Sequence, residues 1–137
     1  MRAALRRAAV YLWASPVSIA ALPFAALGAA TGGRLRVVGG VLEAGGGALR
    51  PILSRAVPGF PIQAITLGHV VLGASREDLA DSREHERVHV RQYERWGALF
   101  PMLYAVSSLR ALVLGGDVYG GNAFEREAFQ AEGIDVA

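Results

Sequence analysis

Two histidines and one glutamate between positions 85 and 89 have the types and spacing of a metal site that activates water. The stretch reads His85-Glu86-Arg87-Val88-His89. On a helix, side chains four positions apart lie one turn from each other on the same face, so both imidazoles can bind one divalent ion at about 2.0–2.1 Å. Glu86 is offset around the helix axis, where its carboxylate can hold a metal-activated water and accept its proton. A metal, a water and a base held together suit hydrolysis at a peptide carbonyl.

A third ligand has to come from elsewhere in the chain. The sequence contains no cysteine, which excludes thiolate sites. The remaining histidine, His69, lies upstream, and the position six residues after His89 is Arg95. A carboxylate therefore remains, and the downstream candidates are Asp117, Glu125, Glu127, Glu132 and Asp135. Glu125 and Glu127 are about 200° apart around a helix, so only one of them can face the ion.

Two segments resemble the zinc-binding helices of the gluzincin metallopeptidases. The run from His85 to Gln92, HERVHVRQ, is similar to the HExxHxxQ form of the zincin helix. Residues 122–132, NAFEREAFQAE, are similar to the second gluzincin helix, which presents a glutamate in the pattern Glu-x-x-Ala-Asp. The resemblance covers about residues 65–132. It implies a zinc-dependent peptidase with one Zn²⁺ ion, in which the strand before the active helix binds the substrate in extended form.

The same resemblance implies that Glu125, followed by Ala128, is the third ligand, with Glu127 as the reserve. Phe129 stands where the family has an aspartate, so that position does not supply the family's supporting carboxylate. Glu125 also has a second interpretation. Asn122-x-x-Glu125 is a capping pattern, in which the glutamate would reach back to the start of its helix.

Three further side chains are candidates for the surroundings of the ion. Gln92 lies on the histidine face one turn beyond His89, where it can hydrogen-bond a ligand or a substrate, or pack beside Trp96. His69 can line the cleft or cap a strand edge. Tyr119, in a glycine-rich loop, can stabilise an oxyanion, a role that some gluzincins give to tyrosine or histidine.

Residues 1–33 predict an N-terminal apolar membrane anchor or hairpin. Three arginines within the first seven residues precede an uncharged run from Ala8 to Ala30, which is long enough to cross a hydrocarbon core of about 30 Å. A cleaved signal peptide has a similar basic start, but its apolar part is usually shorter. Pro16 and Pro23 permit either a kinked span or a hairpin. The flanking arginines leave the membrane orientation open.

The remaining residues, 34–137, predict an α+β, minimal zincin-like domain with a short sheet, an active-site helix and a second ligand helix. We expect a strand pair or a strand and turn over 34–44, a short helix over 48–57 and one strand over 62–72. Ser75 and Asp78 give a start signal for the active-site helix, which should run from about Arg76 to Trp96 and end at Gly97. A buried or interfacial apolar helix over 99–114 and the second ligand helix over 122–132 complete the domain.

Arginines at positions 83, 87, 91 and 95 form a stripe along the active-site helix. We expect a solvated face partly paired with Glu84 and Glu94, with contact to lipid phosphates as the alternative.

The composition points to a membrane rather than to nucleic acid as a partner. Hydrophobic residues make up 53% of the chain and its mean hydropathy is +0.32, which is high for a protein too small to bury so much apolar surface. No basic tract alternates with aromatic residues, as a nucleic-acid surface requires. We therefore expect a membrane-associated zinc metallopeptidase that acts on a peptide or protein substrate close to the bilayer. The alternative is a non-catalytic, membrane-associated metal-binding or scaffold protein that retains the zincin fold.

Overall fold

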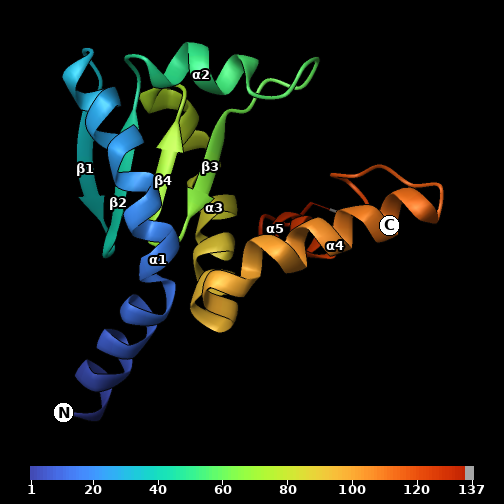
Figure 1. The fold of residues 1–137 in the computed structure, drawn as a ribbon, viewed down its shortest axis with the longest axis horizontal. Helices are drawn as coiled ribbons and strands as arrows, with labels where there is room; N and C mark the ends of the chain where they lie inside the picture. Colours follow the sequence, from blue (N-terminus) through green and yellow to red (C-terminus); the bar gives the residue numbers. More distant parts are fainter. Residues whose placement is uncertain (135–137) are drawn as a thin grey trace.

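The computed structural model describes residues 1–134, in which a small mixed sheet carries helices on both faces (Figure 1). The α+β class expected from the sequence is confirmed. The elements in chain order are α1 (Arg2–Ala30), β1 (Arg34–Val38), β2 (Val41–Gly45), α2 (Leu49–Arg55), β3 (Ala64–Leu67), β4 (Val70–Gly73), α3 (Arg76–Trp96), the 3₁₀ turn η1 (Gly97–Leu99), α4 (Phe100–Val113) and α5 (Ala123–Ala131).

The strands lie in the order β1-β2-β4-β3, with β2 and β4 parallel and the other neighbours antiparallel. The expected strand pair over 34–44 is confirmed as the β1–β2 hairpin. The expectation of one strand over 62–72 is wrong, because Gly68, at φ +66°, turns the chain back and divides this run into β3 and β4. Apolar periodicity does not distinguish one long strand from two short ones. As a result, β3 is an edge strand of the sheet.

Helix α1 packs against one face of the sheet through a stripe of small residues. The buried positions are Ala14, Ala21, Ala25 and Gly28, whose spacing places them on one side of the helix. Ala21 and Ala25 belong to the same core cluster as Ala44, Val70 and Leu72 of the sheet. Residues 2–30 form one continuous helix that contains both prolines, and not a hairpin.

This close contact gives a stability prediction. We expect Ala21→Leu to lower the free energy of unfolding by about 1–3 kcal/mol, because the side chain is fully buried against the sheet and the added carbons overpack the core. Ala20→Leu, on the exposed side of the same helix, should change it by less than about 0.5 kcal/mol. Urea unfolding of the two variants measures the difference. Equal effects would mean that α1 does not pack on the sheet as described.

Helix α3 covers the opposite face of the sheet, where Leu79 and Val90 pack on Val71. Its expected start and end are confirmed, since the Ser75 hydroxyl accepts a hydrogen bond from the Asp78 N–H at 3.0 Å and Gly97 ends the helix.

The arginine stripe of α3 is only partly solvated. The expectation of pairing with Glu84 and Glu94 is wrong for Arg83 and Arg87, which both bind the buried Glu43 of β2, at 2.9 and 3.1 Å. Glu43 comes from a segment far away in the sequence, so helix spacing alone could not identify it.

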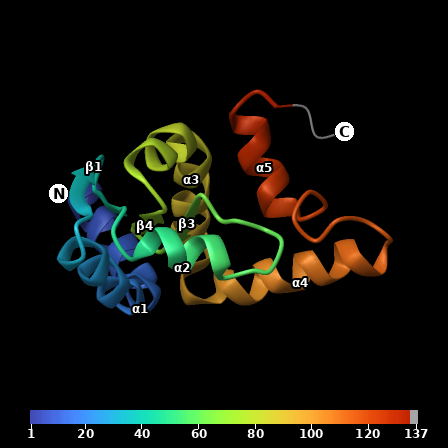
Figure 2. The same ribbon diagram turned by 90° about the horizontal axis from the view of Figure 1, so that it is seen from above.

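Two helical runs are long and apolar enough to cross a membrane, Arg2–Ala30 and Arg76–Val113. The second run bends at η1, where α4 turns sharply away from α3 (Figure 1). Helix α5 then returns across the back of α4 towards α3 (Figure 2). The two helices that carry the proposed ligands are therefore neighbours.

Candidate metal centre

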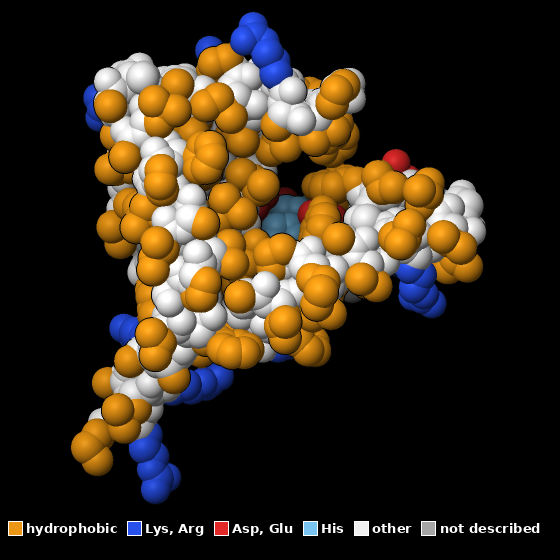
Figure 3. Space-filling view, in the orientation of Figure 1, with side chains coloured by type: hydrophobic (Ala, Val, Ile, Leu, Met, Phe, Trp, Pro, Cys, Tyr) orange, Lys and Arg blue, Asp and Glu red, His pale blue; other side chains and the backbone are white. Residues whose placement is uncertain are grey.

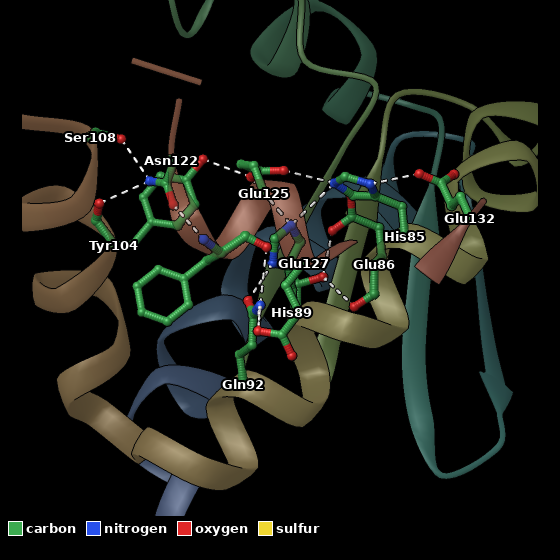
Figure 4. A network of polar contacts seen from close by, with 12 residues as sticks. His85, Glu86, His89, Gln92, Tyr104, Ser108, Asn122, Glu125, Glu127 and Glu132 are labelled. Atoms are coloured by element: carbon green, nitrogen blue, oxygen red, sulfur yellow. Dashed lines mark hydrogen bonds and ion pairs between the residues drawn. The ribbon is translucent and has the colours of Figure 1, made fainter. Parts of the chain in front are cut away.

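The side chains of His85, His89 and Glu125 converge on one point between α3 and α5 (Figure 4). The two imidazole Nε2 atoms are 3.3 Å apart. Glu125 Oε2 lies 2.8 Å from His85 Nε2, and Glu125 Oε1 lies 3.3 Å from His89 Nε2. All three residues are buried, and the group could hold a metal ion.

The spacing of the two imidazoles fits a small divalent cation. Two ligands that each lie about 2.0–2.1 Å from a tetrahedral ion are about 3.3 Å from each other. The Nε2–Nε2 distance of 3.3 Å matches this edge, whereas Glu125 Oε2 lies closer, at a hydrogen-bonding distance of 2.8 Å from His85 Nε2. Two imidazoles and a carboxylate are a donor set that several divalent metals accept.

Both histidines are held in the orientation that directs Nε2 to the common point. His85 Nδ1 lies 2.9 Å from Glu132 Oε2, and His89 Nδ1 lies 2.8 Å from Gln92 Oε1. An acceptor at Nδ1 keeps the proton there, which leaves Nε2 for a metal. Glu132 supplies the carboxylate support that Phe129 cannot, and Phe129 instead packs edge-on against His85.

The electrostatics of the group favour positive charge at its centre. Burial alone would raise the pKa of Glu125, but hydrogen bonds with His85 and His89 outweigh it and lower this pKa to about 2. Burial likewise opposes the charged form of His85, but Glu125 and Glu132 outweigh it and raise its pKa to about 9. The carboxylates thus stabilise a cation at this point.

Glu86 lies beside the group and is held by the sheet. Its Oε2 accepts a 2.6 Å hydrogen bond from Thr66 Oγ1, on the edge strand β3. Burial raises the pKa of Glu86, opposed by the nearby His89 and by the hydrogen bond from Thr66. A buried carboxylate with a raised pKa next to a cation site is suited to take up and return a proton.

Glu125 does not cap its helix. Asn122 performs that role, because its Oδ1 accepts the Phe124 N–H at 2.9 Å. Glu125 Oε1 instead accepts a 2.7 Å hydrogen bond from Tyr104 Oη of α4. Glu127 points to Gln92 and not to the two histidines, since its Oε2 accepts a 3.1 Å hydrogen bond from Gln92 Nε2.

Asn122, at the start of α5, also binds Tyr104 and its helix α4. The Asn122 side-chain amide donates to the Tyr104 carbonyl at 3.0 Å and to Ser108 Oγ at 2.8 Å. The apolar helix α4 is thereby tied to the helix that carries Glu125.

The group lies at the base of a cleft with a volume of about 960 Å³. Strand β3 borders this cleft, and its walls include Phe60, Pro101 and Tyr119. Tyr119 packs against Phe60 with ring centroids 5.2 Å apart. In the space-filling view, histidine and acidic surface is visible at the bottom of the hollow (Figure 3).

His69 does not reach this cleft. It follows Gly68 in the β3–β4 turn, where its ring stacks on Tyr11 at 3.9 Å and its Nε2 lies 2.9 Å from Glu94 Oε1. The prediction that His69 lines the cleft is therefore wrong. Gln92 lies on the histidine face, as expected, and its Oε1 is 2.8 Å from His89 Nδ1.

Two neighbours of the site, Thr66 and Tyr104, were not singled out in the sequence. Glu132 was one of five candidate carboxylates, but its contact with His85 depends on how α5 crosses α3. Two candidate carboxylates remain. Asp117 accepts hydrogen bonds within its own loop, and Asp135 lies outside the described residues.

The Glu132 contact gives a second prediction. We expect Glu132→Gln to weaken metal binding by about 10–100-fold, because His85 loses the charged acceptor that orients its ring. Glu84→Gln, at an exposed position one residue before His85, removes the same charge without this contact and should bind normally. Competition with a chelating dye measures both affinities. Equal binding by the two variants would show that Glu132 does not support the ligand.

Comparisons of the chain with protein-family models, with curated proteins and with solved structures find no match. The gluzincin resemblance of the two helices therefore remains a prediction, and the geometry of the group is the independent evidence for a metal site.

Proposed function

We propose that the protein is a membrane-associated zinc metallopeptidase. The observation that carries this proposal is the convergence of two Nε2 atoms and one carboxylate, buried at the base of a cleft, with a second buried carboxylate beside them. Two imidazoles and a carboxylate form a frequent ligand set of catalytic zinc.

Each residue then has a distinct task. His85, His89 and Glu125 would hold the ion, which when bound supplies Lewis-acid activation of water and of the peptide carbonyl. Glu86 would accept the proton from the attacking water and pass it to the leaving amine, while Thr66 keeps its carboxylate in place. Tyr119, on the cleft wall, is the candidate for a hydrogen bond to the carbonyl oxygen as charge develops on it.

The substrate would lie along β3. An edge strand has backbone groups on one side that are free of sheet partners, and an extended peptide can pair with them. Strand β3 is such an edge, it borders the cleft, and its Thr66 contacts Glu86. A peptide on this edge would pass beside the proposed base.

The number of ligands favours catalysis over the alternative of a non-catalytic metal-binding or scaffold protein. A structural zinc site normally has four protein ligands, whereas a catalytic site has three and a position for water. The candidate group contains three ligands among residues 1–134, and His69, the histidine that could have made a fourth, binds Glu94 instead.

Metal removal tests the proposed function. The purified protein should contain about one zinc per chain and hydrolyse a quenched fluorescent peptide library. Dialysis against a chelator should abolish hydrolysis, and stoichiometric zinc should restore it. Hydrolysis that survives complete removal of the metal would refute the proposal, as would a protein that binds no divalent metal.

A further inference from the structure

Helices α1 and α4 share one broad apolar face of the molecule. In Figures 1 and 2 both lie on the same side, with α3 and α5 behind them. Leu5, Leu12, Ile19 and Leu27 follow the side of α1 opposite its small-residue stripe and are 42–75% exposed. On α4, Met102, Val106, Leu109 and Val113 form a similar exposed stripe. The two helices meet where Trp13 packs over Gly97.

The exposed charges of the half of the chain that contains α1 have one sign. Between positions 1 and 76 the chain has eight arginines, all exposed: Arg2, Arg6, Arg7, Arg34, Arg36, Arg50, Arg55 and Arg76. The one acidic residue in this half is Glu43, which is buried and bound to Arg83 and Arg87. Most charged side chains visible at the edge of the apolar face are basic, and an acidic group lies on the α4 side (Figure 3).

We propose that α1 and α4 form a docking face that lies in the plane of an anionic lipid bilayer. Large apolar side chains bordered mostly by arginines match the acyl region and the negative headgroups of such a surface. A second copy of the chain fits less well, because a symmetric contact through this face would bring two basic rims together.

The packing of α1 argues for this in-plane arrangement over a transmembrane one. One side of α1 is buried between Ala14 and Gly28, and within this stretch Ala21 and Ala25 pack on the sheet. The sheet carries Arg34 and Arg36 on its exposed edge strand β1, and these charges cannot enter hydrocarbon together with α1 without a large cost. Helix α1 can therefore cross a bilayer only by leaving the sheet.

The cleft opens on the same face. Its base is visible in Figure 3 between α4 and the segment that contains Phe60. A docked molecule would thus receive a polypeptide segment from the bilayer surface, and this last step rests on the function proposed above.

Vesicle flotation tests the docking face without any need for metal or activity. The full-length protein should float with phosphatidylcholine vesicles that contain phosphatidylserine, and less with pure phosphatidylcholine or at high salt. Ile19→Glu and Leu109→Glu should each reduce binding at least tenfold. Ala80→Glu, at an exposed position of α3 on the other side of the sheet, should bind as the parent does.

The orientation of α1 on the bilayer can be measured with single-cysteine variants, because the chain contains no cysteine. After the protein is added to sealed vesicles, Arg2→Cys and Arg34→Cys, at the two ends of α1, should both react with an impermeant maleimide. An environment-sensitive dye on Phe60→Cys should shift to the blue on binding, and the same dye on Ala80→Cys should not.

Several outcomes would overturn the proposal. If one end of α1 reacts with the maleimide only after detergent is added, the helix spans the bilayer. Equal binding by Leu109→Glu and Ala80→Glu would exclude this face, and a dimer that Leu109→Glu dissociates would assign it to a second copy. None of these results bears on the metal-dependent activity, which the chelation experiment tests separately.

Discussion

Replacing Glu86 by glutamine should abolish most peptide hydrolysis and leave the metal in place. Glutamine keeps the size of the side chain and can still accept the hydrogen bond from Thr66, but it cannot take a proton from water. Loss of a general base costs about 10²–10⁴-fold in rate, so kcat should fall by that factor with little change in KM. Zinc content, measured on the same preparation by atomic emission, should stay at about one per chain.

Glu84→Gln is the matched control, since it removes one carboxylate from an exposed position of the same helix. It should retain full activity. A Glu86→Gln protein that keeps zinc and hydrolyses peptide at the parent rate would refute the proposed base, although the metal site itself would stand.

Replacing Glu125 by glutamine should remove the metal. Glu125 is the one carboxylate within hydrogen-bonding distance of both Nε2 atoms in the described part of the chain. A neutral amide does not replace the charge that neutralises the ion, so affinity should fall by more than the about 10–100-fold expected for an outer partner such as Glu132. Activity should fall with the metal content, and added zinc should restore it only in part.

Glu127→Gln provides the comparison on the same helix. Its side chain points to Gln92 and not to the histidines, and glutamine can still accept the hydrogen bond from Gln92. This variant should bind zinc as the parent does. The opposite result, with metal lost in Glu127→Gln and kept in Glu125→Gln, would contradict the ligand set.

The sequence predicted best what lies on one helix. His85, Glu86, His89 and Gln92 are within two turns of α3, where their relative positions follow from helix geometry once Ser75 and Gly97 mark its ends. Glu125 required the resemblance to a known second helix, because nothing local distinguishes it from Glu127.

Residues that reach the site through tertiary packing were not predicted. Thr66 contacts Glu86 because the run over 62–72 folds into a hairpin at Gly68, whereas a single strand was expected. Tyr104 belongs to a helix whose sequence is mostly apolar, and its hydroxyl reaches Glu125 where Asn122 joins that helix to α5. Such contacts depend on the relative placement of whole elements, which spacing along one element does not specify.

The bridge between α3 and α5 has a mechanical consequence. An ion shared by His89 and Glu125 is a reversible cross-link that closes the chain between them into a loop containing α4. Closing a loop restricts the unfolded chain, and an ion that binds only the folded form stabilises it further as its concentration rises. Such an ion would couple the attachment of α4, and with it the outer surface of the molecule, to the supply of the metal.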